Sequence, residues 1–293
     1  MSAVSCQLVS RFLLLRESDI LSGMRVSFIE FLNAVPLGWG LLHGEGKDPV
    51  ELFLDVPSLC ADKLARGEAD VGLIPVIEYQ RIPGLRIVPD IAIAAKHEVR
   101  SVLFVSKVPI ERVSSVAVDT ASRTSVALLR ILLEKFYLNR NVKFEPSQAH
   151  PSMLSAHDGA LVIGNPALKI RREDLFIYDL AGEWNSFTGL PFVFAFWAVR
   201  EGLDLGKSVG VFYESREAGM NSIPEICATY GQRLGIPPAE IRSYLLHNLN
   251  YSLDEQNRRG LECFFSYAAQ LGIITRVRPL EFVTLDCTTE GIW

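Results

Sequence analysis

The sequence predicts an α/β fold made of two lobes, with a ligand cleft between them. Short runs of β-forming residues alternate with helical patterns from residue 24 onward, which is typical of α/β proteins. The continuous apolar run at 192–199 has the length of a strand buried on both faces, and it follows many other elements. Glycine and proline are spread evenly, so no flexible linker separates the two halves of the chain.

These observations favour a chain that leaves one lobe, builds a second, and returns to the first. We therefore expect a discontinuous first lobe at residues 24–110 and 195–293, and a second lobe at residues 111–194. The chain has 293 residues, of which 49% are hydrophobic, so it is long and apolar enough to bury a core in each lobe.

Composition also limits the partners. The formal net charge of −5 argues against nucleic acid or an anionic membrane surface, although a few local donors can still bind a small carboxylate. The five cysteines are scattered and form no C-x-x-C pair, which indicates free thiols in a reducing compartment. We therefore expect a cytoplasmic protein.

The first 23 residues stand apart from this pattern. Their apolar run at 12–15 is too short for a secretory signal, and no run in the chain approaches the roughly 20 apolar residues of a membrane span. Met24 comes directly before the first strand pattern. Our hypothesis is that translation begins at Met24 and that residues 1–23 are an unstructured extension.

The strands are predicted from short runs rich in Val, Ile, Leu and Phe that end at turn-forming residues. Asn33 and Pro36 break the first of these runs, and Gly164 ends a later one. A strand–helix–strand unit near the start predicts parallel pairing. Strands are expected at 25–31, 52–55, 69–74, 86–93, 101–106, 113–118, 160–163 and 192–199.

The helices are predicted from apolar periodicity and from end signals. Ser58 is placed to cap a helix that opens at Pro57 and stops at Gly67. Ser252 and Glu255 fit a capping box for the last long helix. Helices are expected at 37–42, from 57 to 67, from the turn at 119–124 to about 137, and at 222–234, 238–249 and 254–271.

The turn at 119–125 (DTASRTS) is the most informative local feature. It lies between a strand and a helix N-terminus, where free N–H groups and the helix dipole favour a carboxylate or phosphate. The hydroxyls of Ser122, Thr124 and Ser125 can add hydrogen bonds to such an anion. Ordinary N-capping by one of these hydroxyls is an equally good interpretation.

Other polar residues lie at places where open parallel sheets bind ligands. Asn33 follows the first strand, although an Asn before a turn often serves local backbone hydrogen bonds. Ser58 and Asn165 are placed first as helix caps and second as cleft donors, while Ser101 opens a strand. The histidines show no metal-ligand spacing, and the sequence has no nucleophile elbow, P-loop or G-x-G-x-x-G motif. We expect no metal.

Seven stretches of the chain together carry a family resemblance. They are 31–36 (FLNAVP), 57–61 (PSLCA), 67–79 (GEADVGLIPVIEY), 100–102 (RSV), 119–130 (DTASRTSVALLR), 164–167 (GNPA) and 188–193 (TGLPFV). This set resembles the chorismate dehydratase family of the futalosine route to menaquinone. The resemblance runs from residue 24 to about residue 274, and it implies a type II periplasmic-binding-protein-like fold with the ligand held between two lobes.

The resemblance implies a hydro-lyase that converts chorismate to 3-[(1-carboxyvinyl)oxy]benzoate without a cofactor. In this interpretation the catalytic residues are Asn33, which hydrogen-bonds the departing hydroxyl, and Ser101. The matching stretches hold no Asp, Glu or His placed as a general base, so our hypothesis is that the substrate's enolpyruvyl carboxylate takes the proton. The residues expected to bind the two substrate carboxylates and the rest of the ligand are Ser58, Thr124, Ser125 and Asn165.

The expected partner is thus a small dicarboxylate, chorismate, with no nucleic acid and no membrane, in a monomer or homodimer. Two alternatives share the fold. A solute-binding protein of a transporter is disfavoured because the sequence shows no export signal. The sister enzyme 1,4-dihydroxy-6-naphthoate synthase is disfavoured because the stretches at 31–36 and 74–79 look closer to the dehydratase.

Overall fold

The computed structural model describes residues 23–44, 50–119, 121–147, 153–171 and 173–285. The expected extension at the N-terminus therefore lies, except for Gly23, outside the described residues. Within these ranges no helix is both long and apolar enough to cross a bilayer. The described thiols Cys60, Cys227 and Cys263 are free, as expected, and burial raises the pKa of Cys60 to about 12.

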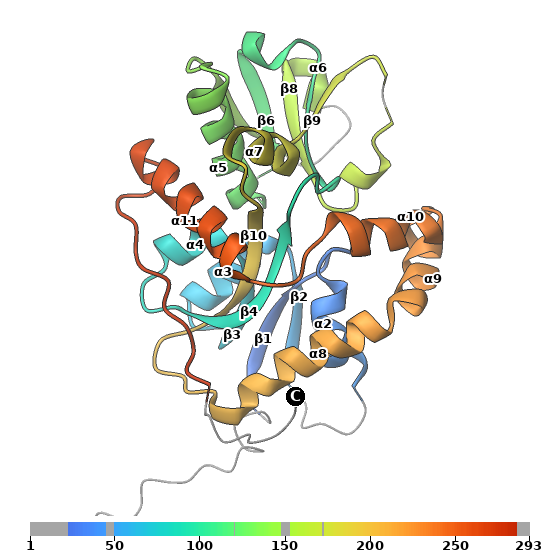
Figure 1. The fold of residues 1–293 in the computed structure, drawn as a ribbon, viewed down its shortest axis with the longest axis vertical. Helices are drawn as coiled ribbons and strands as arrows, with labels where there is room; N and C mark the ends of the chain where they lie inside the picture. The colour runs from blue at the N-terminus through green and yellow to red at the C-terminus, as the bar shows by residue number, and fades with distance from the viewer. Residues whose placement is uncertain (1–22, 45–49, 120, 148–152, 172, 286–293) are drawn as a thin grey trace, which may run out of the picture.

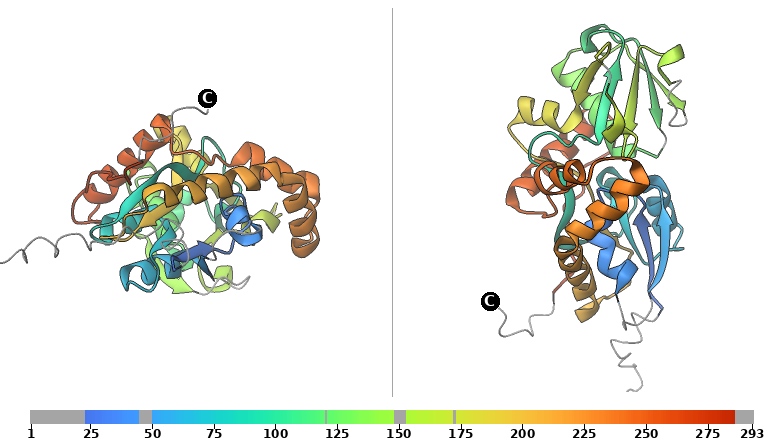
Figure 2. Two further views of the ribbon diagram at one scale, coloured as in Figure 1. Left: turned by 90° about the horizontal axis from the view of Figure 1, so that it is seen from below. Right: turned by 90° about the vertical axis from the view of Figure 1, so that its right-hand side faces the viewer.

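The chain folds into two lobes, each built on a five-stranded sheet (Figure 1). The view from the side shows the same division (Figure 2). The first sheet has the order β2-β1-β3-β10-β4, with β1 (Arg25–Ile29), β2 (Glu51–Asp55), β3 (Val71–Pro75), β4 (Arg86–Ala95) and β10 (Phe192–Val199). The second has the order β7-β6-β8-β5-β9, with β5 (Val102–Ser106), β6 (Ser115–Asp119), β7 (Lys143–Ser147), β8 (Gly159–Ile163) and β9 (Phe176–Asp179).

Strand β10 brings the chain back to the first lobe. It lies between β3 and β4, antiparallel to both, and every one of its residues is buried. The expected return of the chain and the expected two-sided burial of 192–199 are therefore confirmed. At the other side of the sheet, β1 pairs in parallel with β2 and β3.

The second sheet takes a different part of the chain from the one expected. Strand β5 pairs with β8 and β9, so the chain enters the second lobe before residue 102 and not at residue 111. It returns where β10 begins at Phe192, before residue 195. The Val, Leu and Phe content of residues 101–106 predicts a strand, but the choice of sheet depends on pairing partners far away in the sequence.

Helices cover both sheets. The first lobe carries α2 (Val35–His43), α3 (Pro57–Ala65), α4 (Val76–Arg81), α8 (Gly210–Asn221), α9 (Ile223–Leu234), α10 (Pro238–Ser243) and α11 (Glu255–Gln270). The second carries α5 (Arg123–Ile131), α6 (Met153–Ala156) and α7 (Leu180–Thr188). Helices α5 and α10 each continue as a π-helical turn, at Leu132–Phe136 and Tyr244–Asn248.

Several elements were not expected, among them α4, α7, α8, β7 and β9. Helix α4 follows β3 directly after Pro75. Because its first residues are apolar, the sequence pattern assigns them to the end of the strand and does not predict a helix. Helix α8 packs along α2, where a Cβ on Gly219 would lie 2.1 Å from the carbonyl oxygen of Pro36. That contact requires glycine, a residue that otherwise lowers helix propensity.

Three expected caps are wrong, and for one of them, Asn165, the N-cap of the turn at Ala167–Lys169 is instead Pro166. The N-cap of α3 is Val56, and Ser58 lies inside the first turn with no capping bond, because Pro57 takes the first helical position that proline prefers. The N-cap of α11 is Asp254, whose side chain accepts a hydrogen bond from the backbone N–H of Asn257 at 2.8 Å. Ser252 lies two residues further from the helix.

Asp70, which directly precedes β3, ties the ends of three adjacent strands of the first sheet together, β1, β3 and β10. Its carboxylate accepts hydrogen bonds from Arg25 Nη2 at 2.9 Å and from Arg200 Nε at 2.7 Å. Burial opposes its ionisation, but the hydrogen bonds from the two arginines outweigh burial and lower the pKa of Asp70 to about 2. Because this value is below that of an unfolded chain, about 4, the stabilisation is present above pH 4 and is lost as the pH falls from 4 toward 2.

We predict that Asp70→Asn lowers the free energy of unfolding by roughly 1 kcal/mol at pH 7 and that the difference from wild type shrinks between pH 4 and 2. Urea denaturation at pH 7, 4 and 3 measures both effects. Glu68→Gln is the matched control, because Glu68 pairs with Arg66 at a distance of 2.7 Å on the exposed surface. Equal losses in the two variants at pH 7 would contradict the prediction.

Candidate functional site

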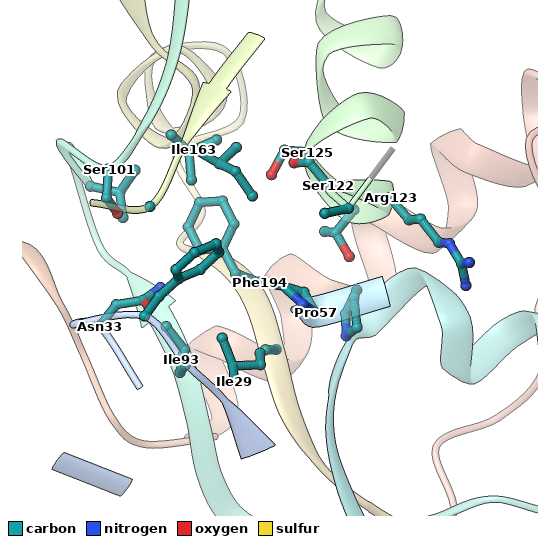
Figure 3. A pocket seen from close by; sticks show the side chains of 18 residues that line it. Ile29, Asn33, Pro57, Ile93, Ser101, Ser122, Arg123, Ser125, Ile163 and Phe194 are labelled. Atoms are coloured by element: carbon teal, nitrogen blue, oxygen red, sulfur yellow. The ribbon is translucent and has the colours of Figure 1, made fainter. Parts of the chain in front are cut away.

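A pocket lies between the two lobes, which we call the interlobe pocket (Figure 3). Its walls come from the ends of β1 and β3, from β10, from the segment that crosses between the lobes, and from the start of α5. The free volume is about 50 Å³, well below the roughly 300–1,000 Å³ of pockets that hold small ligands. In this arrangement the lobes leave too little free space for a ligand of that size, so we expect them to separate when a ligand enters.

Polar side chains without a partner converge on this pocket. Asn33 Oδ1, Ser101 Oγ and Ser122 Oγ are buried and make no hydrogen bond of good geometry within the described protein, the buried Tyr244 hydroxyl being the polar neighbour of Ser101. Figure 3 shows Asn33 and Ser101 on one side of Phe194 and Ser122 on the other. A buried polar group without a partner costs about 1–3 kcal/mol, so a ligand that pairs with these groups binds favourably.

The helix N-terminus predicted to bind an anion lines the pocket. Ser122 is the N-cap residue of α5, but its side chain makes no capping hydrogen bond. Ser125 lies in the first turn, and both serines are almost fully buried. Of the two interpretations that the sequence left open, capping by Ser122 is thus not what the structure shows. The first turn of α5 instead presents N–H groups and hydroxyls to the pocket.

Arg123 belongs to the same turn, but its guanidinium points away from the pocket (Figure 3). It forms a two-pronged ion pair with Asp62 of α3, with N–O distances of 2.8 and 3.0 Å, and it contacts Glu78 Oε2 of α4 at 3.1 Å. These carboxylates belong to the first lobe, so Arg123 links the lobes at the edge of the pocket. Apart from Arg123, the described lining residues carry no ionisable side chain.

Thr124 and Asn165 make hydrogen bonds between the lobes. Thr124 Oγ1 accepts from the backbone N–H of Ile77 at 3.3 Å, and Asn165 Oδ1 accepts from that of Leu32 at 3.1 Å. Ile77 lies in the first turn of α4, where N–H groups have no partner inside the helix. A residue of one lobe therefore satisfies the helix start of the other.

The structure brings together most, but not all, of the expected site residues. Asn33, Ser101, Thr124 and Ser125 line the pocket. Ser58 and Asn165 are not among the lining residues; Pro57 and Gly164, their neighbours, are. In both cases the turn reaches the pocket through the residue beside the one expected.

Aromatic walls were missed by sequence reasoning. Phe31 and Phe194 line the pocket, and a Cβ on Gly164 would lie 3.1 Å from the Phe31 ring. Gly164 also has a φ of +67°, so both its backbone and its contact with Phe31 require glycine. The signal was present in the Gly164-Asn165-Pro166 turn, but its contact with the opposite lobe cannot be read from local sequence.

The described residues contain no group of three or more His, Cys, Asp or Glu side chains that could hold a metal ion. The groups that line the pocket are hydroxyls, an amide, backbone N–H groups and aromatic side chains. Such a set binds an anionic ring compound through neutral donors.

The fold and the pocket define a two-lobed protein of periplasmic-binding-protein-like fold with a pocket between its lobes. A crystallised protein of Archaeoglobus fulgidus is similar in fold, with a TM-score of 0.70, 19% identity and coverage of 86% of this chain and 99% of that one. The periplasmic aliphatic sulphonate binding protein of Escherichia coli is similar with a TM-score of 0.58, 13% identity and coverage of 93% and 97%.

A family model described as menaquinone biosynthesis matches residues 24–270. The chorismate dehydratase of Thermus thermophilus is 32% identical over 228 residues, which are 71% of this chain and 83% of that protein. The chorismate dehydratase of Campylobacter jejuni is 26% identical over 251 residues, or 84% and 97%. The chain belongs to this chorismate dehydratase family of menaquinone biosynthesis.

We predict that Arg123→Gln shifts the lobes toward an open arrangement. A two-pronged, partly buried pair contributes roughly 1–2 kcal/mol to the closed state, so the open fraction rises several-fold. Small-angle X-ray scattering should show a larger radius of gyration for this variant without ligand.

Arg130→Gln is the matched control, because Arg130 lies on the same helix and, among the described residues, pairs with Glu134 of the following π-helical turn at 2.6 Å and not with the other lobe. An unchanged radius for Arg123→Gln, or an equal increase in both variants, would show that the Arg123 contacts do not close the cleft.

Proposed function

We propose that this protein is a chorismate dehydratase that supplies 3-[(1-carboxyvinyl)oxy]benzoate to menaquinone biosynthesis. The observation that supports this most directly is the placement of Asn33 and Ser101, both with unpaired polar atoms, opposite the N-terminus of α5 in one closed pocket. The dehydratase relatives favour this function over transport and over the sister enzyme of the pathway.

The reaction removes the C4 hydroxyl and the C3 proton of chorismate and leaves an aromatic ring. Aromatisation makes the reaction favourable, so the protein has to orient the substrate and stabilise charge that develops as the C3 proton leaves. The two carboxylates of the substrate need binding sites. The start of α5, with Ser122 and Ser125, suits one of them.

A pocket in which the lining cation, Arg123, turns its guanidinium away from the ligand space is compatible with this substrate. Backbone N–H groups and hydroxyls bind a carboxylate through hydrogen bonds alone. No fixed positive charge then lies beside the carboxylate to draw negative charge away from the reacting ring. Burial makes such hydrogen bonds stronger than they are in water. The closed lobes exclude water from the same space.

The proton acceptor is the substrate itself in this proposal. The described lining residues include no Asp, Glu or His, so the protein offers no ordinary general base there. The enolpyruvyl carboxylate of chorismate is attached at C3 through its ether oxygen and can reach the C3 proton. Holding it in place gives the advantage of an intramolecular reaction.

Asn33 and Ser101 are the residues proposed to act on the reacting atoms. Asn33 lies on the turn that leads into α2, and its amide can donate a hydrogen bond to the departing hydroxyl. Ser101 is fully buried, and its hydroxyl can orient the substrate from the crossing segment. The proposal also includes a cytoplasmic location, which the free thiols support, and a monomeric or homodimeric state.

We predict that the purified protein converts chorismate to an aromatic enolpyruvyl product and that Asn33→Ala lowers kcat by about 100- to 1,000-fold. KM should change by only a few-fold, because the amide acts mainly on the departing group. Product formation followed by absorbance and liquid chromatography gives both constants.

Asn221→Ala is the control, since Asn221 lies exposed at the end of α8, far along the chain from the pocket residues. If the wild-type protein leaves chorismate unchanged, the proposed function is refuted. If Asn33→Ala weakens binding as much as turnover, Asn33 holds the ligand and does not act on the departing hydroxyl.

We predict that Ser122→Ala weakens chorismate binding by about 10-fold or more, since a hydrogen bond to a charged group contributes about 1.5–3 kcal/mol. Isothermal titration of an inactive Asn33→Ala background measures this affinity. Ser222→Ala is the matched control because Ser222 is also an N-cap residue without a capping bond, at the start of α9. Equal affinities for the Ser122 and Ser222 variants would place the carboxylate elsewhere.

A further inference from the structure

The segment that crosses from β4 to β5, residues 96–101, separates two hollows. Val99 and Ser101 line the interlobe pocket on one side. Glu98 and Arg100 line a groove on the other side, together with Asp179. From Glu98 to Ser101 successive residues therefore line opposite sides, and the direction of Ser101 depends on the backbone at Arg100.

Arg100 has an unusual backbone conformation. Its φ is +62°, in the left-handed region that residues with a Cβ rarely adopt. Such a conformation persists only where surrounding contacts hold it, and it is found disproportionately at functional sites. On one side of it, the carbonyl oxygen of Ser101 accepts a hydrogen bond from Gly164 N–H at 2.8 Å. On the other side lies Asp179.

Asp179 binds the backbone of the crossing segment directly. Its Oδ1 accepts from Val99 N–H at 3.0 Å, and its Oδ2 accepts from Arg100 N–H at 2.5 Å. The same Oδ1 accepts from Ala181 and Gly182 N–H, both at 3.1 Å, so Asp179 is also the N-cap of α7. One carboxylate thus joins the crossing segment to a helix of the second lobe.

The capping role does not account for all of these bonds. A cap needs one side-chain oxygen, and Oδ1 supplies it. Oδ2 is left for Arg100 alone, the residue with the positive φ. Sequence position also matters, because Ser101 follows Arg100 directly and its Oγ is unpaired in the pocket.

We propose that Asp179 is a positioning residue for the dehydration: it holds Arg100 in the left-handed conformation and thereby aims the Ser101 hydroxyl into the interlobe pocket. This inference rests on the proposed function of Ser101. Without the hydrogen bond that its N–H donates to Oδ2, Arg100 relaxes toward negative φ, the peptide before Ser101 rotates, and the hydroxyl leaves its place.

Asp179→Ser separates positioning from capping. Serine is a good N-cap residue, so α7 keeps its cap, but a single short hydroxyl cannot reach the Arg100 N–H as well. We expect kcat to fall about 10- to 100-fold, KM to stay within about three-fold, and the melting temperature to change little. Unchanged kcat in Asp179→Ser would overturn the proposal.

A second substitution in the Asp179→Ser background distinguishes loss of positioning from a general structural defect. Glycine adopts positive φ without strain, so adding Arg100→Gly should raise kcat several-fold. Arg100→Ala is the control: it removes the same side chain, and its 2.7 Å contact with Glu240, but keeps the Cβ. If the glycine variant is no more active than the alanine variant, Asp179 does not act through the Arg100 backbone.

Hydrogen exchange gives a readout that does not require turnover. In Asp179→Ser the amides of Val99 and Arg100 should exchange at least 10-fold faster than in wild type, while those of Ala181 and Gly182 stay protected. Unchanged exchange at Val99 and Arg100 overturns the positioning role. If wild-type protein does not convert chorismate but the exchange result is as expected, the proposed function fails while the hold of Asp179 on the segment stands.

Discussion

The contact of Arg123 with Asp62 and Glu78 brings the start of α5 over the first sheet, and the interlobe pocket depends on it. Two neutral hydrogen bonds act in the same direction, from Ile77 N–H to Thr124 and from Leu32 N–H to Asn165. All of these bonds join backbone or side chains of opposite lobes. Closing the cleft therefore gives hydrogen-bond partners to polar groups that would otherwise face water. It leaves the polar groups inside the pocket without partners.

The groups left unsatisfied determine the chemistry that the site can perform. Asn33, Ser101 and Ser122 offer hydrogen bonds in a space without a lining carboxylate or imidazole. Such a site is poorly suited to remove a proton by itself, but it can bind an anion and support a departing hydroxyl. Neutral donors would also allow an acidic chain to bind the proposed dicarboxylate substrate.

Much of the fold follows from local patterns. The apolar run at 192–199 indicated a strand buried on both faces, and β10 occupies the interior of the first sheet. Strand β5 shows the limit, because its composition predicts a strand but not the sheet that it joins. Helix α8 shows another limit, since Gly219 weakens the helical pattern and is explained only by the backbone of α2 that packs against it.

For the site, the sequence by itself determined which turns carry polar groups: Asn33 after β1, Ser101 before β5, and the serines at the start of α5. Whether those groups face a ligand, cap a helix or join the lobes was decided only by the tertiary structure. Thr124 illustrates this, since its hydroxyl bonds to a backbone N–H of the opposite lobe. The physical reason is that a hydrogen bond depends on where both partners lie, and here the partners are brought together by packing between segments distant in sequence.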